Sequence, residues 1–125
     1  MNRFIWIGLG AILGANARYL VGVWAGSRFG ADFPYGTLLV NITGSLLLGF
    51  LVTLSAGRLQ LSPELRLFLA VGFFGSYTTF SSFAVESIFL FQDGGLGRGI
   101  FNILGNNLIG LMGALLGVYL ARALG

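Results

Sequence analysis

The chain has 125 residues, of which 56% are hydrophobic and only 9% are charged, and its formal net charge is +3. Soluble domains carry about 25% charged residues, so this composition indicates an integral membrane protein. Cysteine and histidine are absent, which excludes disulfides, thiolate chemistry and the usual metal ligands. All seven cations are arginines scattered along the chain without a basic run, which argues against a nucleic-acid-binding protein.

Four apolar stretches are long enough to cross a bilayer, which needs about 20 residues per helix. They cover residues 4–25, 36–55, 67–91 and 100–120. The loops between them are short, so we expect residues 1–125 to form a single four-helix transmembrane unit. Ala15-Asn16-Ala17 resembles a signal-peptide cleavage site. The apolar pattern resumes directly after it, which favours a retained helix.

The arginines show only a slight bias toward one side of the predicted bundle. With an even number of spans, both termini and the second loop share one side and carry Arg3, Arg58, Arg66 and Arg122. The opposite side carries Arg28 and Arg98. Orientation normally follows an arginine and lysine excess in the cytoplasmic loops. The slight bias here predicts insertion in both orientations, which permits an antiparallel homodimer, the two-chain equivalent of an inverted repeat.

The third apolar stretch contains an unusual run over residues 72–83, Gly-Phe-Phe-Gly-Ser-Tyr-Thr-Thr-Phe-Ser-Ser-Phe. Gly72 and Gly75 weaken a helix, and the hydroxyls after them can replace lost backbone partners. Non-helical backbone at membrane depth is tolerated only where it is buried in protein or lines a cavity. For any single residue, a packing face of small side chains is the alternative. The run as a whole predicts a functional break in the helix.

Polar side chains in the first two stretches also need partners. Arg18 is a charge inside the membrane, so we expect it to face a cavity or a partner, unless it snorkels to the interface. Thr37, Asn41 and Ser45 recur every four residues and form one polar stripe. The Asn41 amide is either a bond between helices or a ligand for a passing anion.

Two faces of the third helix and one face of the fourth carry the remaining polar residues. Beyond the predicted break, Thr79, Ser82 and Glu86 share one face, and Phe80, Phe83 and Ser87 share the next. Glu86 either reaches interfacial water or hydrogen-bonds at a pore mouth. One face of the fourth helix combines amides and glycines and predicts a tightly packed polar seam: Asn102, Asn106, Gly110, Gly113 and Gly117.

The sequence offers little for catalysis. It contains no nucleophile–base pair, carboxylate pair or phosphate-binding loop, and arginine does not deprotonate. We therefore expect a protein that is not an enzyme. Hydroxyls, amides and the positive edges of phenyl rings can line a path in which a small anion loses water and stays coordinated.

Three segments resemble one known family, the bacterial fluoride channels (Fluc, or CrcB). Residues 33–45, Phe-Pro-Tyr-Gly-Thr-Leu-Leu-Val-Asn-Ile-Thr-Gly-Ser, resemble its Pro-aromatic-Gly-Thr…Asn element. Residues 72–86 resemble its helix-3 signature, with Ser82 and Ala84 in place of a usual threonine and serine. Residues 16–19, Asn-Ala-Arg-Tyr, match its helix-1 arginine region. In the fourth helix, Asn102 and Asn106 replace the tyrosine and serine of many members.

The resemblance implies passive fluoride export, which lowers fluoride toxicity, through a multi-pass protein of the bacterial cytoplasmic (inner) membrane. It implies an antiparallel, dual-topology homodimer with two pores. A structural Na⁺ would lie at the dimer axis, bound by the backbone carbonyls of Gly75 and Thr78. The implied fluoride-pore residues are Arg18, Thr37, Asn41, Phe80, Ser81, Ser82, Phe83, Glu86 and Asn106.

Two other functions fit a small four-helix membrane protein. A multidrug-type cation/proton antiporter needs a membrane-embedded acid early in the chain, whereas the first helix here carries Arg18 and favours an anion. A structural or holin-like subunit gives no reason for Asn41, the phenylalanine pair and the helix break to occur together.

Overall fold

The computed structural model describes residues 2–124, and its regular elements over this range are all helices. Four helices are long and apolar enough to cross a membrane: Asn2–Phe29, Tyr35–Ala56, Pro63–Gln92 and Leu96–Leu124. Each extends beyond the corresponding predicted stretch at both ends. The prediction of four spans joined by short loops is therefore confirmed.

The third and fourth spans are each built from several helical pieces. The third comprises α3 (Pro63–Arg66), the π-helical η1 (Leu67–Phe74), α4 (Gly75–Tyr77) and α5 (Phe80–Gln92). The fourth comprises α6 (Leu96–Leu104), the π-helical η2 (Gly105–Ile109) and α7 (Gly110–Leu124). Because π-helical turns are rare and often mark functional sites, their occurrence in these two spans draws attention to the polar residues around them.

The third span is interrupted at Thr78 and Thr79. Both residues have extended backbone, with φ/ψ of −87°/158° and −151°/118°. The predicted break is confirmed, but the glycines do not cause it, because Gly72 and Gly75 both remain helical. α5 restarts with Thr79 as its N-cap, whose hydroxyl accepts a hydrogen bond from the Ser82 amide at 3.2 Å.

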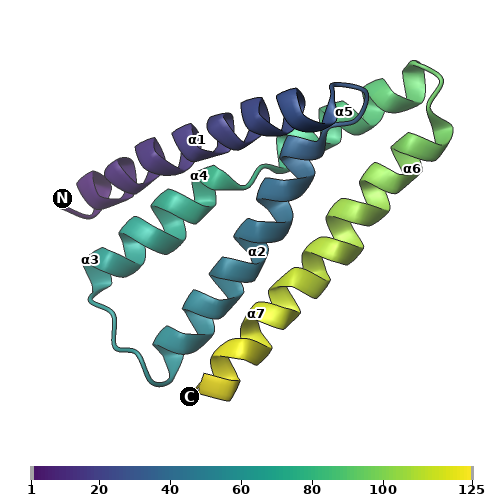
Figure 1. Ribbon diagram of the computed structural model, residues 1–125. Coiled ribbons are helices and arrows are strands. Elements are labelled where there is room, and N and C mark those ends of the chain that lie inside the picture. Colours follow the sequence, from purple (N-terminus) through teal and green to yellow (C-terminus); the bar gives the residue numbers. More distant parts are fainter. Residues whose placement is uncertain (1, 125) are drawn as a thin grey trace.

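The helices associate as two pairs that meet beyond the break (Figure 1). In one pair, α1 (Asn2–Phe29) runs along η1 and α4. In the other, α2 (Tyr35–Ala56) runs along α7. α5 packs on α6 and joins the two pairs at the end of the molecule that lies away from both termini (Figure 1).

Glycines bring the α1–η1 pair into backbone contact. A Cβ on Gly10 would collide with the Phe68 carbonyl, and one on Gly14 would collide with the Phe73 carbonyl. Gly72 therefore packs against α1 and does not break its own helix. Farther along α1, Gly22 meets α2, because a Cβ on Gly36 would collide with the Gly22 Cα, whereas Gly26 faces open space.

Glycines bring the α2–α7 pair into backbone contact in the same way. A side chain on Gly117 would collide with the Leu46 carbonyl, and one on Gly113 would lie 3.1 Å from the Ile42 carbonyl. Close backbone approach through small residues is the normal helix contact in lipid, where no hydrophobic force drives helices together. The glycine face that was predicted for the fourth helix is therefore a packing seam.

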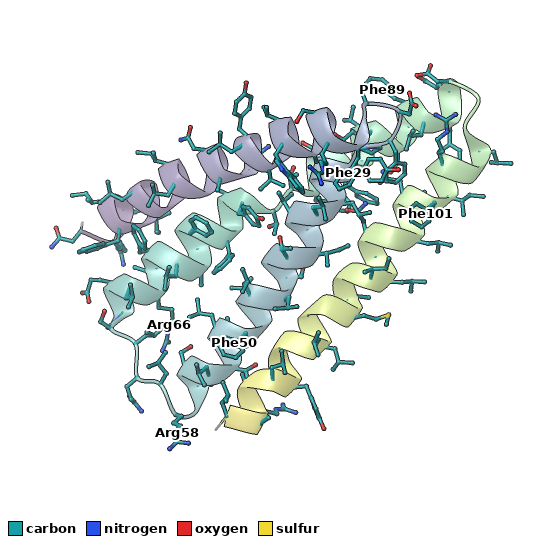
Figure 2. The ribbon with its side chains drawn as sticks, in the orientation of Figure 1. Phe29, Phe50, Arg58, Arg66, Phe89 and Phe101 are labelled. Atoms are coloured by element: carbon teal, nitrogen blue, oxygen red, sulfur yellow. The ribbon has the colours of Figure 1, made fainter. Side chains whose placement is uncertain are left out.

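The loop after α2 lies at the same end as the C-terminus, where Figure 2 places Arg58 and Arg66. Arg58 donates a hydrogen bond from Nη1 to the Leu124 carbonyl at 2.9 Å. α3 begins with Ser62 at the N-cap, which accepts a bond from the Leu65 amide at 3.1 Å, and with Pro63 in the first turn.

Candidate functional site

The side chain of Asn41 on α2 forms hydrogen bonds with the backbone at the break in the third span. Its Oδ1 accepts a hydrogen bond from the Thr79 amide at 2.9 Å, and its Nδ2 donates to the Thr79 carbonyl at 3.1 Å. Oδ1 thereby replaces the acceptor that the Thr79 N–H loses at the break, and Nδ2 adds a second donor to the Thr79 carbonyl, which as the N-cap carbonyl also accepts the first bond of α5. Irregular backbone at membrane depth needs such substitutes because lipid supplies none. The structure thus shows Asn41 in the first of its two expected roles, a bond between helices, and its role as an anion ligand stays a prediction.

Arg18 also binds the backbone beside the break. Its Nε donates to the Ser76 carbonyl at 3.0 Å, and the side chain is half-buried. In an uninterrupted helix that carbonyl would accept from the Phe80 amide, so the break itself supplies the acceptor. Arg18 therefore has a partner inside the protein, as the sequence predicted for a charge at this depth.

Two pockets lie on either side of Thr79. The first, here called the arginine pocket, has a volume of about 310 Å³. The second, here called the phenyl pocket, has a volume of about 220 Å³. Thr79 lines both. The arginine pocket is lined by Arg18, Tyr19, Gly22, Val23, Gly36, Thr37, Thr79, Ser82 and Glu86. The phenyl pocket is lined by Asn41, Ser45, Thr78, Thr79, Phe80, Phe83, Asn106 and Asn107.

The two predicted faces of α5 lead to different pockets. Thr79, Ser82 and Glu86 line the arginine pocket, whereas Phe80 and Phe83 line the phenyl pocket. The two phenyl rings have centroids 5.5 Å apart. The Phe83 side chain is buried at 8% exposure, but Phe80 is 77% exposed, so one wall of the phenyl pocket is open in the single chain.

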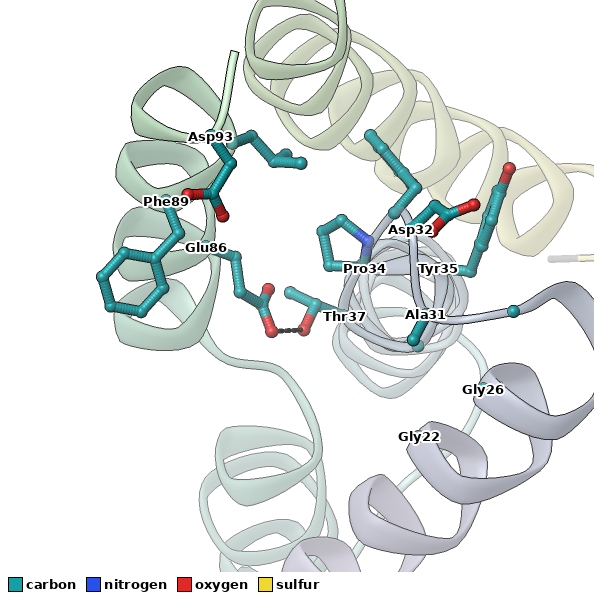
Figure 3. A pocket seen from close by; sticks show the side chains of 14 residues that line it. Gly22, Gly26, Ala31, Asp32, Pro34, Tyr35, Thr37, Glu86, Phe89 and Asp93 are labelled. Carbon is teal, nitrogen blue, oxygen red and sulfur yellow. Dashed lines mark hydrogen bonds between the residues drawn. The ribbon is translucent and has the colours of Figure 1, made fainter. Parts of the chain in front are cut away.

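A third pocket of about 410 Å³, here called the end pocket, opens at the α1–α2 loop (Figure 3). It shares Thr37 and Glu86 with the arginine pocket. Figure 3 shows these two side chains pointing toward each other from α2 and α5, and the Thr37 hydroxyl donates to Glu86 Oε2 at 3.0 Å. Glu86 Oε1 is buried without a hydrogen-bond partner among residues 2–124. Of the two roles considered for Glu86, a hydrogen bond at a pocket is the one observed.

The amides of the fourth span join this site through a chain of hydrogen bonds. Asn41 Nδ2 donates to Asn106 Oδ1 at 2.8 Å. Asn106 Nδ2 donates to the carbonyl and to Oδ1 of Asn102, at 2.9 and 3.0 Å. Asn102 Nδ2 donates to Ser87 Oγ at 2.9 Å. The polar seam predicted for the fourth helix is therefore connected to both neighbouring spans.

Other candidate residues lie apart from one another. Ser82 lines the arginine pocket, but Ser81 is exposed on the outer surface of α5, where its Oγ lies 3.5 Å from the Thr79 hydroxyl. The carbonyls of Gly75 and Thr78 are released by the break, because the amides that would bind them in a helix are used elsewhere. The Thr79 amide binds Asn41, and the Ser82 amide binds the Thr79 hydroxyl.

Sequence reasoning did not identify three contacts of the site. The Ser76 carbonyl is one, because no side-chain pattern marks a backbone acceptor. The Thr43 hydroxyl, 2.9 Å from Tyr77 Oη, is the second. The third is the N-cap role of Thr79, for which a signal existed. Threonine three residues before Ser82, ahead of an apolar run, favours a helix start at this position.

Comparisons with known proteins identify the family of this chain. The chain matches the family described as CrcB-like protein, Camphor Resistance (CrcB), over residues 5–118. Relatives named fluoride-specific ion channel occur in Trichormus variabilis (45% identical; 97% of this chain and 89% of the relative) and Agrobacterium fabrum (46%; 99% of each chain). A third, from Synechocystis, is 49% identical over 93% of this chain and 89% of the relative.

Proposed function

We propose that this chain, which belongs to the CrcB-like family, conducts fluoride passively across the bacterial cytoplasmic membrane as an antiparallel homodimer. Residues 1–125 would form one subunit. The observation that carries the proposal is a series of three pockets from the end of the bundle to the helix break. Neighbouring pockets share a lining residue that can donate a hydrogen bond: Thr37 between the end and arginine pockets, and Thr79 between the arginine and phenyl pockets. The names of the relatives supply the identity of the ion.

The chemistry of the arginine and phenyl pockets suits an anion, whereas the end pocket that leads to them is lined by three acidic residues, Asp32, Glu86 and Asp93. Arg18 is a fixed cation in the arginine pocket, and Ser82 adds a hydroxyl donor to its wall. Thr37 lies at the entrance together with Glu86. Farther in, the phenyl pocket offers the edges of two aromatic rings, which carry the positive side of the ring quadrupole. A dehydrated fluoride can exchange its water for these donors in turn.

Asn41 and Asn106 are the amides proposed to meet the ion at the phenyl pocket. Both N–H groups of Asn41 are occupied, one by the Thr79 carbonyl and one by Asn106 Oδ1. Fluoride is an anionic acceptor and forms a stronger hydrogen bond than a neutral amide oxygen. We therefore infer that the ion takes the place of Asn106 Oδ1 while the bonds to Thr79 persist.

Exposed polar groups at membrane depth support a dimer. Ser81 and Asn107 lie near the helix break on outward-facing surfaces, and the ring of Phe80 is 77% exposed. Lipid cannot satisfy hydroxyls and amides, so a protein surface is the favourable cover. A second copy in the opposite orientation would close the open wall of the phenyl pocket and create two equivalent pores. Ser81 would then reach the ion path together with Ser82.

The released carbonyls of Gly75 and Thr78 suit a structural Na⁺. Unwound carbonyls inside broken transmembrane helices are typical Na⁺ ligands. Gly75 lies exposed on the surface beside the break, so two copies can contribute four oxygens around one ion. The ion would neutralise these carbonyl dipoles at the centre of the interface.

A passive pore is sufficient for export. A negative-inside membrane potential drives an anion outward by about 2.3 kcal/mol per charge for each 100 mV. The opening of such a pore would lower cytoplasmic fluoride without an energy source other than this potential.

Purified protein in liposomes loaded with potassium fluoride should release fluoride when valinomycin supplies the balancing potassium current. An ion-selective electrode measures the efflux, and matched chloride-loaded liposomes measure selectivity. We expect fluoride release and chloride retention, because the line of donors suits a small ion that accepts strong hydrogen bonds. Equal chloride release would remove the claim of selectivity, and release of neither ion would remove the channel.

Substitutions in the phenyl pocket should block this efflux. Phe80→Ile removes an aromatic edge, and Asn41→Asp replaces the N–H donors with an oxygen that repels the anion. Each should slow fluoride release at least about tenfold, equivalent to ~1.4 kcal/mol added to the barrier, with the dimer retained on size-exclusion chromatography. Phe4→Ile, on an outward surface of α1, is the matched control. Wild-type rates in both pocket variants would contradict these assignments.

Dual topology can be measured by labelling, because the chain has no cysteine of its own. Gln60→Cys lies in the loop after α2, and Gln92→Cys lies at the opposite end of the third span. An impermeant maleimide applied to intact cells should label about half of each variant if insertion is random. Complete labelling of one variant and none of the other would establish a single orientation and refute the antiparallel dimer.

Removal of Na⁺ should weaken the dimer if the ion binds the released carbonyls. Protein exchanged into N-methylglucamine buffer should shift toward monomer or lose fluoride efflux, and return of Na⁺ should restore both. Mass photometry in detergent and the efflux assay measure the two effects. An unchanged, fully active dimer after exhaustive Na⁺ removal would exclude a required ion at this position.

A further inference from the structure

We infer that Asn102 and Ser87 are positioning residues that orient the Asn41 amide through Asn106 and so fix the break of the third span. The four side chains form one chain of hydrogen bonds, here called the amide relay. The relay itself does not depend on the proposed function; only its effect on fluoride flux does.

The orientation of the relay is set at its first end by the backbone. The Thr79 amide can only donate and the Thr79 carbonyl can only accept, so Asn41 must present Oδ1 to the first and Nδ2 to the second. The second N–H of Asn41 then points at Asn106. Asn106 must therefore present its oxygen to Asn41, because a flipped amide would place two donors face to face.

The order of donors and acceptors that Thr79 sets continues through the amides of the fourth span. With Oδ1 turned to Asn41, the Nδ2 of Asn106 faces the Asn102 carbonyl, a group that only accepts, and also the Asn102 Oδ1. The oxygen of Asn102 is thereby fixed, and its Nδ2 must donate to Ser87 Oγ. Each amide orients the next, so no member can flip alone without pairing two donors or two acceptors.

The far end of the relay is also fixed by the backbone. Ser87 Oγ receives the Asn102 bond and donates its own proton to the Phe83 carbonyl at 2.8 Å. Thr79 and Phe83 belong to the start of α5, so the relay leaves this helix at the break, crosses α2 and the fourth span, and returns to the same helix. α5 is consequently attached at two points, one on each side of Phe80.

Burial makes the relay sensitive to the loss of one member. Asn102 is fully buried at 0% exposure and Ser87 is 5% exposed, so water cannot replace a missing partner. Asn41 and Asn106 are the members that line the phenyl pocket, whereas Asn102 and Ser87 are not among its lining residues. A residue with no access to the ion can therefore influence the ion path only by positioning Asn41 and α5.

Amide hydrogen exchange at Thr79 measures the orientation of Asn41 directly, because Asn41 Oδ1 protects this proton. In the full-length protein in nanodiscs, Asn102→Ala and Ser87→Ala should each accelerate Thr79 exchange at least roughly tenfold. Exchange in the glycine-packed part of α7 should stay unchanged. Ser87→Thr retains the hydroxyl and should restore protection. Asn16→Ala, which removes an amide bonded to its own helix on the surface of α1, is the matched control.

If the proposed function is correct, fluoride efflux should fall in the two alanine variants in parallel with Thr79 protection and recover in Ser87→Thr. Unchanged Thr79 protection in both alanine variants would overturn the inference. Should Asn102→Ala fail to fold, the Ser87→Ala and Ser87→Thr pair still decides the question. If the alanine variants lose Thr79 protection and the wild-type protein releases no fluoride, the relay is supported and the channel is refuted.

Discussion

The rest of the site depends on two hydrogen bonds, which join the Asn41 side chain to the backbone N–H and the backbone carbonyl of Thr79. A helix cannot stop at membrane depth unless its free backbone groups find partners. One side chain supplies both a donor and an acceptor to the backbone of the same residue, so the chain can extend over two residues and start a new helix. The released carbonyl of Ser76 becomes available to Arg18, and the new helix carries Phe80 and Phe83.

The break also explains why polar groups gather in one layer of an otherwise apolar molecule. Between the break and the termini, glycines bring α1 against η1 and α2 against α7 in close backbone contact. Such contacts exclude side chains and leave no room for a polar path. Near Thr79 the pairs separate enough for the arginine and phenyl pockets to form, and every junction between neighbouring pockets of the site lies on a residue that donates or accepts a hydrogen bond.

Much of this architecture could be predicted from the sequence, because hydropathy and spacing are local signals. The four spans, the Thr37–Asn41–Ser45 stripe and the two faces of α5 follow from periodicity alone. The exact position of the break could not be predicted from Gly72 and Gly75, because Gly72 is used for contact with α1 and Gly75 is an exposed residue of α4 that stays helical. The amide relay could not be predicted either, since it depends on the register between helices that are 15 to 65 residues apart in the chain.

The amide relay lies near the helix break and away from the termini, and this placement determines the order in which the regions of the molecule should unfold. Toward the termini, the exposed bond from Arg58 to the Leu124 carbonyl is a polar tie that water can replace. Near the break, buried amides constrain one another and open only together. Thermal opening should therefore start where the chain begins and ends and proceed inward. The ion path would be the last region to lose its shape.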